Sequence, residues 1–283
     1  MTGRLVHTGQ VVVDLVMRVD AMPPVGGDTL ASSFSQHAGG GFNVMAAAAR
    51  SGASVVYAGS HGSGQFDQVA LSALAAEGIA LALPPDGNDI GVCFVIVDAA
   101  GERTFVTSPG AEGRVRPVEV SSADIVYVTG YSLTHEVNRD ALLAWLPTVD
   151  ATVLLDPSPL VRDIPLGTWR AVLPYVDILS CNASEAAALS DVDARTKVLR
   201  AGPDGCVIVH NGQKTHVPAF PVKPVDTNGA GDTHCGVLAA ELLRGNDLTY
   251  AAKRANAAAA LSVTHHGPAT APTRAEINNQ LGE

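Results

Sequence analysis

Residues 226–233 read Asp226-Thr227-Asn228-Gly229-Ala230-Gly231-Asp232-Thr233 and open an alanine- and leucine-rich segment, about 230–244, that favours a long helix. Small residues at a helix start leave the first amides uncovered, and these amides together with the helix dipole favour an anion. A carboxylate beside a bound anion is unfavourable unless it has a function. Taking a proton from a hydroxyl that attacks a phosphoryl group is such a function. The segment therefore predicts a phosphate site with Asp232 as its base. The alternative is a glycine turn whose aspartate complements the helix dipole.

Apolar strands alternate with helical segments along the rest of the chain. The first expected strand runs from Leu5 to Val13 and is followed by Asp14; others are expected at 55–58, 125–129, 152–155, 178–180 and 206–210. Strands joined by long crossovers indicate an α/β fold with a mostly parallel sheet. The stretches 29–37 and 92–107 carry strands without helices and can pair as a small second sheet.

Composition excludes several classes of protein. The chain has 283 residues, of which 47% are hydrophobic and 16% charged, with a formal net charge of -10. This apolar content excludes general disorder, and the acidic balance argues against a broad nucleic-acid footprint. No apolar run approaches the roughly 20 residues of a membrane helix. Asp14 and Arg18 interrupt the first apolar stretch, so no signal peptide is expected and the predicted location is cytoplasmic.

Cysteine and histidine spacing does not indicate a metal site. The four cysteines, at 93, 181, 206 and 235, have neither zinc-ligand nor redox spacing, and we expect buried free thiols. His265 and His266 are adjacent, and no histidine pair has the i, i+4 spacing of a helical metal site.

Residues 226–232 resemble the D-[TS]-x-G-A-G-D motif of the ribokinase-like (PfkB) carbohydrate kinases. Further resemblances follow in the family's order along nearly the whole chain, at Asp14, Gly26-Gly27-Asp28-Thr29, Gly39-Gly40-Gly41-Phe42-Asn43, Gly101-Glu102-Arg103-Thr104, Asp156-Pro157-Ser158-Pro159, Asn182-Ala183-Ser184-Glu185 and Gly202-Pro203-Asp204-Gly205. Each motif alone is a weak signal, and their shared order is a strong one.

The resemblance implies a ribokinase-like, three-layer α/β/α fold with a mostly parallel central sheet and a small β-sheet lid. It implies a single kinase domain over residues 1–283, with the lid built from about 14–38 and 90–108. The segment between residues 190 and 200 is short, which indicates that a helix carried by relatives is lost there. A homodimer in which two lids pair is common in the family, and exposed lid edges give it a physical motive.

The resemblance also assigns roles at the acceptor side. Asp232 matches the general base, and Gly229, Ala230 and Gly231 match the anion hole whose amides hold the transferring phosphoryl group. Sugar-hydroxyl ligands are matched by Asp14 and Asn43, and Gly39 and Gly40 let a flat polyol approach the backbone. The alternatives are a strand-end turn residue for Asp14 and a helix cap for Asn43.

ATP and Mg²⁺ are the cofactors that the resemblance implies. Residues matching the nucleotide site are Asn182, Arg200, Gly202, Gly205 and Asn256. Asn182 and Glu185 match residues that organise Mg²⁺ through water, with a capped helix start as the alternative. Arg200 suits phosphate charge, with a solvated surface arginine as its alternative. Asp226 and Asn228 are candidate ligands for a monovalent cation, so K⁺ is a further candidate cofactor.

The expected activity is ATP-dependent phosphorylation of a primary hydroxyl on a small sugar. Gly40 stands where phosphosugar kinases of the family carry lysine, which favours a neutral acceptor. Phe34, Phe94 and Phe105 either stack on a base or pack within the lid, so a nucleoside kinase of the inosine, adenosine or pseudouridine type is the alternative. A non-catalytic sugar- or nucleotide-binding regulator is a third possibility. A dinucleotide-binding oxidoreductase is disfavoured because no G-x-G-x-x-G follows the first strand.

Overall fold

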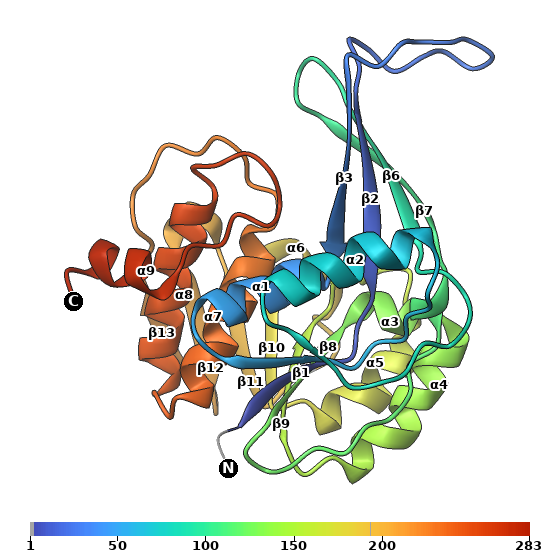
Figure 1. The fold of residues 1–283 in the computed structure, drawn as a ribbon. Coiled ribbons are helices and arrows are strands. Elements are labelled where there is room, and N and C mark those ends of the chain that lie inside the picture. The colour runs from blue at the N-terminus through green and yellow to red at the C-terminus, as the bar shows by residue number, and fades with distance from the viewer. Residues whose placement is uncertain (1–2, 193) are drawn as a thin grey trace.

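The computed structural model describes residues 3–192 and 194–283, and within them nine strands form a large sheet (Figure 1). These strands are β1 (Arg4–His7), β4 (Ser54–Tyr57), β5 (Ala80–Leu81), β8 (Ile125–Thr129), β9 (Thr152–Asp156), β10 (Ile178–Asn182), β11 (Thr196–Arg200), β12 (Cys206–His210) and β13 (Gln213–Val217). Their order is β13-β12-β11-β10-β9-β8-β1-β4-β5. Among the described strand pairs of this large sheet, β11–β12 and β12–β13 are antiparallel and the others are parallel. The predicted α/β fold with a mostly parallel sheet is confirmed.

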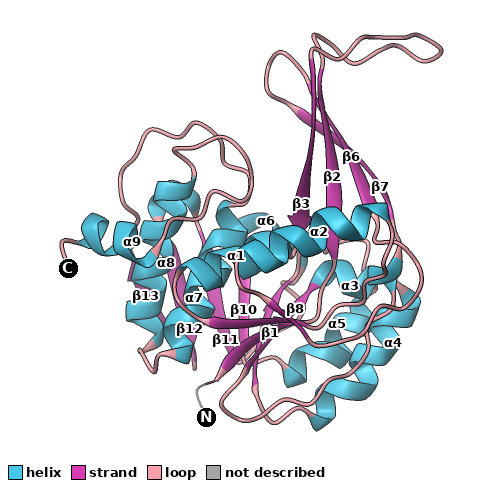
Figure 2. Cartoon of the chain, in the orientation of Figure 1, coloured by secondary structure: helices cyan, strands magenta, loops and turns pink. Residues whose placement is uncertain are grey.

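Helices cover both faces of this sheet (Figure 2). One apolar core involves α1 (Phe42–Arg50), α2 (Gln65–Ala76), α7 (Ala230–Leu243), α8 (Leu248–Ser262) and α9 (Arg274–Leu281). The other involves α3 (Gly130–Thr134), α4 (Glu136–Trp145), α5 (Leu166–Val172) and α6 (Ala183–Ala188). Short 3-10 helices lie at 111–113, 146–148, 173–175 and 202–204. Burial on both faces explains why the central strands β8 and β9 are almost continuously apolar, whereas the edge strand β13 is mostly polar and exposed.

A separate four-stranded sheet projects from this body (Figure 1). Its strands are β2 (Val11–Arg18), β3 (Ser33–Gly40), β6 (Val92–Val97) and β7 (Arg103–Ser108), in the order β3-β2-β6-β7. The predicted single strand Leu5–Val13 is wrong, because the chain leaves the large sheet after His7 and enters the small one at Val11. Asp14 therefore lies inside a strand rather than after one.

The segment after α6 holds turns and then β11. In its described part, residues 189–192 and 194–195, no helix forms before β11 begins at Thr196. All four cysteines are buried and free. In the described chain, no helix combines the length and the apolar character that crossing a bilayer requires.

Parallel strands place their carboxyl ends along one edge of the large sheet. Asp156, Asn182 and Arg200 are the last residues of β9, β10 and β11, and Asn182 pairs directly with Arg200. Open α/β sheets bind ligands outside this edge. Residues far apart in sequence thus gather beside the start of α7 and the base of the small sheet.

Candidate active site

The start of α7 presents unpaired backbone amides. Gly229 precedes the helix with a φ of +74°, a conformation that other residues rarely adopt, and a Cβ there would collide with the Pro268 carbonyl. Thr233 N donates to the Gly229 carbonyl at 2.8 Å and closes the first turn. Within the described residues, the amides of Gly231 and Asp232 have no backbone or side-chain acceptor, as expected for the first turn of a helix. These amides can hold an anion.

Asp232 lies in this first turn and is held by α1. Asn43 Nδ2 donates to Asp232 Oδ2 at 3.0 Å, and the buried Asn43 Oδ1 has no partner among the described residues. Burial raises the pKa of Asp232 to about 6, and the charge of Asp156 acts in the same direction. Asn43 and Arg200 oppose this rise. A carboxylate with such a pKa is ionised at neutral pH and can accept a proton.

Close packing of α1 and α7 sets the Asn43–Asp232 contact. Gly236 faces α1, where an added Cβ would collide with the Val44 carbonyl. Small residues along both helices, including Ala47 and Ala48, are completely buried. The hydrogen bond therefore depends on a helix pair that only small side chains permit.

Asp14 faces the same region from the small sheet. It pairs with His37 of β3 and Cys93 of β6, and a Cβ on Gly39 would collide with its carboxylate. Burial raises the pKa of Asp14 to about 6, and the negative charge of Asp232 adds to the effect. The structure thus brings together Asp14, Asn43 and Asp232, three residues predicted from separate motifs.

A cavity of about 570 Å³ lies between the small sheet and the body. Its lining from the small sheet includes Asp14, Val16, Val95, Arg103 and Phe105, and from the body Phe42, Val69, Ala73, Asp226 and Pro268. The volume is typical of a small-molecule site. Phe105 lines this cavity, whereas Phe94 pairs with Val106 on the opposite face of the sheet, so the two phenylalanines have different surroundings.

Arg200 lies among carboxylates at the edge of the large sheet. Its Nη1 donates to Asp156 Oδ2 at 2.6 Å, and its Nη2 donates to Glu185 Oε2 at 3.2 Å. Further contacts join Nη1 to Ser180 Oγ and Cys235 Sγ at 3.2 and 3.0 Å. The guanidinium also lies beside Gly231. The alternative of a solvated surface arginine is wrong, because this side chain is only 13% exposed and doubly paired.

Asn182 and Glu185 form a capping box at the start of α6. Asn182 Oδ1 accepts from Glu185 N at 2.9 Å, and Glu185 Oε2 accepts from Asn182 N at 2.7 Å. Burial and the charge of Asp156 raise the pKa of Glu185. The alternative of a capped helix start is therefore present. The same arrangement places the buried Glu185 carboxylate beside the predicted phosphate site.

The predicted nucleotide loop lies between β11 and β12. Gly202 and Gly205 have φ values of +56° and +85°, and Ala201 N donates to the Gly205 carbonyl at 2.7 Å. Asn256 is buried, and its Nδ2 donates to the carbonyls of Val217 and Pro218 at 2.9 and 3.2 Å. Asn256 therefore supports the chain after β13, and its role toward a nucleotide stays a prediction.

Asp226 is buried at the end of a segment that leads into α7. Its Oδ1 accepts from Asn228 N at 3.0 Å, and its Oδ2 accepts from Gly267 N at 2.9 Å. Arg103 Nη2 also donates to Oδ2, at 2.6 Å.

Three neighbours of the site were not predicted as functional residues. Asp156 had a local signal, a carboxylate between an apolar strand and Pro157, whereas Arg103 had only its place in a lid motif. Tyr131 follows β8, and burial together with the charges of Asp232 and Asp156 raises its pKa to about 12. No local pattern in the sequence marked Tyr131.

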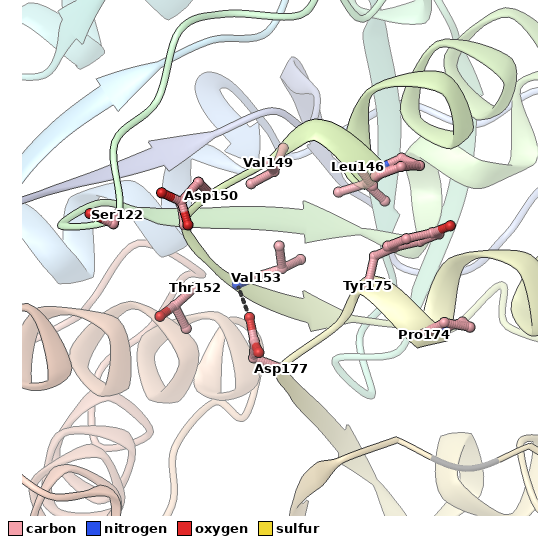
Figure 3. A pocket seen from close by; sticks show the side chains of 11 residues that line it. Ser122, Leu146, Val149, Asp150, Thr152, Val153, Pro174, Tyr175 and Asp177 are labelled. Atoms are coloured by element: carbon pink, nitrogen blue, oxygen red, sulfur yellow. Dashed lines mark hydrogen bonds between the residues drawn. The ribbon is translucent and has the colours of Figure 1, made fainter.

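A second hollow lies elsewhere on the large sheet (Figure 3). It involves Asp150, Thr152, Tyr175 and Asp177, close to where β9 and β10 begin. Asp177 Oδ2 accepts from Val153 N at 2.9 Å, which ties the chain before β10 to β9. Ligand sites of open α/β sheets lie at the opposite, carboxyl ends of the strands, so this hollow is not the candidate site.

Comparison with known proteins points to one family. A family model described as pfkB family carbohydrate kinase matches residues 3–274. A ribokinase of Bacillus subtilis is 29% identical, with 96% of this chain and 97% of that protein covered. An ATP-dependent ribose-1-phosphate kinase of Halopiger xanaduensis is 30% identical, with 99% and 98% covered. The solved structure of a ribokinase from Thermotoga maritima superposes with a TM-score of 0.84 at 23% identity, covering 99% of each chain.

Proposed function

The chain belongs to the pfkB family of carbohydrate kinases, and we propose that it uses ATP to phosphorylate a primary hydroxyl of a small sugar. Asp232 is the general base, and the amides of the Gly229–Gly231 segment are the anion hole. The observation that carries this proposal is the ionisable carboxylate of Asp232 beside unpaired amides at the start of α7. Asp232 also lies close enough to Asp14, which lines the cavity, for its charge to raise the pKa of Asp14.

Asp232 and the amides divide the chemistry between them. The acceptor hydroxyl gives its proton to Asp232 as its oxygen forms a bond to the γ-phosphorus, and the bond between that phosphorus and ADP breaks. The amides of the Gly229–Gly231 segment, together with that of Asp232, donate to the phosphoryl oxygens, where charge is spread in the transition state. Asn43 holds the Asp232 carboxylate toward the hydroxyl with its Nδ2.

Kinases of this family use ATP with Mg²⁺. Among the described residues, no three His, Cys, Asp or Glu side chains are arranged to hold a metal ion. The raised pKa of Glu185 beside Asp156 nevertheless indicates an excess of negative charge that suits a cation. Mg²⁺ would therefore be held mainly by phosphate oxygens, with Asn182 and Glu185 acting through water. Its charge would neutralise the phosphates during transfer.

The small sheet is proposed to act as a lid over the acceptor, within a single kinase domain that covers the chain. Its face carries Asp14, Val95 and Phe105 into the cavity. A covered acceptor excludes water, which competes with the sugar hydroxyl for the phosphoryl group.

Asp14 and the free Asn43 Oδ1 are the proposed ligands of the sugar hydroxyls. Their acceptor atoms suit hydroxyl donors. Gly40 supplies no cation, which favours an acceptor without a phosphate of its own. The curated relatives are named for ribose and for ribose 1-phosphate, and a pentose is therefore the first acceptor to test.

A nucleoside is the second candidate acceptor, and the apolar part of the cavity favours it. Val16, Val95 and Phe105 line the cavity from the small sheet, and Phe42 and Val69 line it from the body. A base attached to a ribose could bury its flat, apolar faces between such walls.

One experiment separates these candidates. Free pentoses and hexoses are compared with inosine, adenosine and pseudouridine in the presence of MgATP, with and without K⁺, and ADP release is measured. Asp232→Asn serves as the control, because it should bind nucleotide without turnover. Turnover of a sugar supports the first candidate, and turnover of nucleosides alone supports the second. Absence of ADP release with every compound of the panel would contradict both candidate functions and indicate a binding regulator.

We also propose a homodimer through the small sheet. On the face away from the cavity, Phe34, Phe94 and Val106 are 54%, 42% and 62% exposed. Exposed aromatic side chains and open strand edges favour pairing with a second copy. Light scattering should give a dimer mass that Phe94→Glu halves, and a monomer of the unchanged chain would overturn the proposal.

A further inference from the structure

One ion pair joins the small sheet to the loop before α7. Arg103 begins β7, and its Nη2 lies 2.6 Å from Asp226 Oδ2. The two side chains are 26% and 7% exposed, so the pair is largely shielded from water. Within the described residues, it is the one ion pair that links the small sheet to the body.

The Asp226 carboxylate is already supplied with donors. Besides Arg103, the amides of Asn228 and Gly267 donate to its two oxygens. Burial opposes ionisation, but these two amides and the Arg103 guanidinium hold the pKa of Asp226 below its ordinary value. The carboxylate is therefore charged, and its counter-charge is a guanidinium.

This arrangement does not fit the monovalent cation predicted from the sequence. A cation bound to Asp226 would need a free carboxylate oxygen with further oxygen ligands around it. Here N–H donors approach both oxygens, and a positive charge already lies 2.6 Å away. A K⁺ ion would compete with Arg103 and meet electrostatic repulsion from it.

Asp226 is connected to the proposed anion hole by short contacts. Gly267 donates to Asp226, and the next residue, Pro268, lies with its carbonyl against Gly229. Asp226 N also donates to the Val263 carbonyl at 3.1 Å, which ties it to the end of α8. A displacement of Asp226 would therefore change the position of Gly229 and the amides that follow it.

We infer that Arg103 is a positioning residue that replaces a bound K⁺ as the counter-charge of Asp226. By this contact the small sheet, when it covers the cavity, aligns the amides of the Gly229–Gly231 segment for phosphoryl transfer. The inference rests on the proposed kinase function. It adds that turnover is independent of K⁺ and that closure over the acceptor and formation of the anion hole are coupled.

The first test compares Arg103→Met and Arg103→Lys with the unchanged chain in about 0.1 M KCl and in choline chloride of equal ionic strength. The unchanged chain should keep its kcat within about twofold between the two salts. Arg103→Met should lose about tenfold in kcat with a smaller change in the KM for ATP, because the amides act mainly in the transition state. Arg103→Lys should recover most of the loss, since it keeps the charge.

KCl should partly restore the kcat of Arg103→Met, because Asp226 Oδ2 then loses its guanidinium partner and the repelling positive charge is gone. Arg195→Met is the matched control. Arg195 is an exposed arginine just before β11, with its Nη1 3.7 Å from Asp177 Oδ1, at the amino ends of the strands and away from the site. It should change neither kcat nor its salt response. A strict K⁺ requirement in the unchanged chain, or full K⁺-independent kcat in Arg103→Met, would overturn the inference.

A second readout separates this inference from the proposed function. The melting temperature is measured in KCl and in choline chloride without any substrate. A binding cation raises the stability of the folded state, so KCl should raise the Tm of Arg103→Met but not that of the unchanged chain. Absence of this difference overturns the inference even when turnover is observed. Its presence supports the inference even when the acceptor panel is silent.

Discussion

Two groups of charged side chains in this molecule, each built around buried members, differ in their balance of positive and negative charge. The helix cluster, made of Glu241, Arg254, Arg274 and Glu283, sets two carboxylates against two guanidinium groups, with distances of 2.7–3.0 Å between α7, α8, α9 and the C-terminus. The site cluster, made of Asp156, Glu185, Arg200 and Asp232, sets three carboxylates against one guanidinium group.

The difference distinguishes a structural role from a functional one. In the helix cluster each charge has a partner inside the protein, which is what a fold needs to bury charges. In the site cluster, burial and the charge of Asp156 raise the pKa values of Asp232 and Glu185. This surplus of buried negative charge destabilises the folded protein. A function explains it, because the site can bind a cation and one of its carboxylates can accept a proton in catalysis.

Asp232→Asn should have the largest effect. The amide cannot accept the proton of the acceptor hydroxyl, and kcat should fall by about 10³-fold, within the range of general-base effects. Nucleotide affinity, measured by calorimetry, should change little because the amides remain. Near-native turnover in this variant would remove Asp232 from its proposed role.

Arg254→Met breaks the helix cluster and should act on stability alone. It removes the completely buried guanidinium 3.0 Å from the completely buried Glu241 and leaves that carboxylate only the partly exposed Arg274 as a guanidinium partner, so it should cost about 3 kcal/mol in the free energy of unfolding, the low end for breaking a buried ion pair. Urea unfolding measures this, and Glu241→Leu in the same chain should recover much of the loss. A loss below about 1 kcal/mol, typical of a surface pair, would mean that the cluster is not buried in solution.

Two variants of the site cluster should shift the pH dependence in opposite directions. The acid limb of kcat/KM should lie near the Asp232 pKa of about 6, because the base must be ionised. Arg200→Met removes a charge that lowers this pKa and should move the limb up by about one pH unit, whereas Asp156→Asn should move it down. Shifts in the same direction would contradict the described electrostatics.

The smallest effect concerns stability and pH. Folding raises the pKa of Asp232 from 3.8 to about 6, so the folded state favours its neutral form. The contribution of this carboxyl group to the free energy of unfolding is therefore fully present below pH 3.8 and is lost as the pH rises through about 6. Asp232→Asn should therefore melt a few degrees higher than the unchanged chain at pH 7.5, with no difference near pH 3.5. An unchanged or lower Tm at pH 7.5 would indicate that the carboxylate is better solvated.

Local patterns were sufficient to predict much of the fold and of the candidate site. Interactions between residues a few positions apart favour the helix at 230–243, the capping box of Asn182 and Glu185 and the individual parallel strands. The first strand was predicted wrongly because apolar residues stand on both sides of the short polar stretch His7–Gln10, and nothing local shows that the two halves pair in different sheets. The roles of the candidate site residues remain predictions.

The sequence by itself determined the family, the α/β class and the residue types at the site, since motifs and periodicity are local properties of the chain. Only the tertiary structure decided which side chains meet. Asn43 and Asp232 are 189 residues apart, and Arg103 and Asp226 are 123 apart. The register of the small sheet and the close packing of α1 on α7 bring these pairs together. Such contacts depend on the positions of whole elements, which no stretch of neighbouring residues specifies.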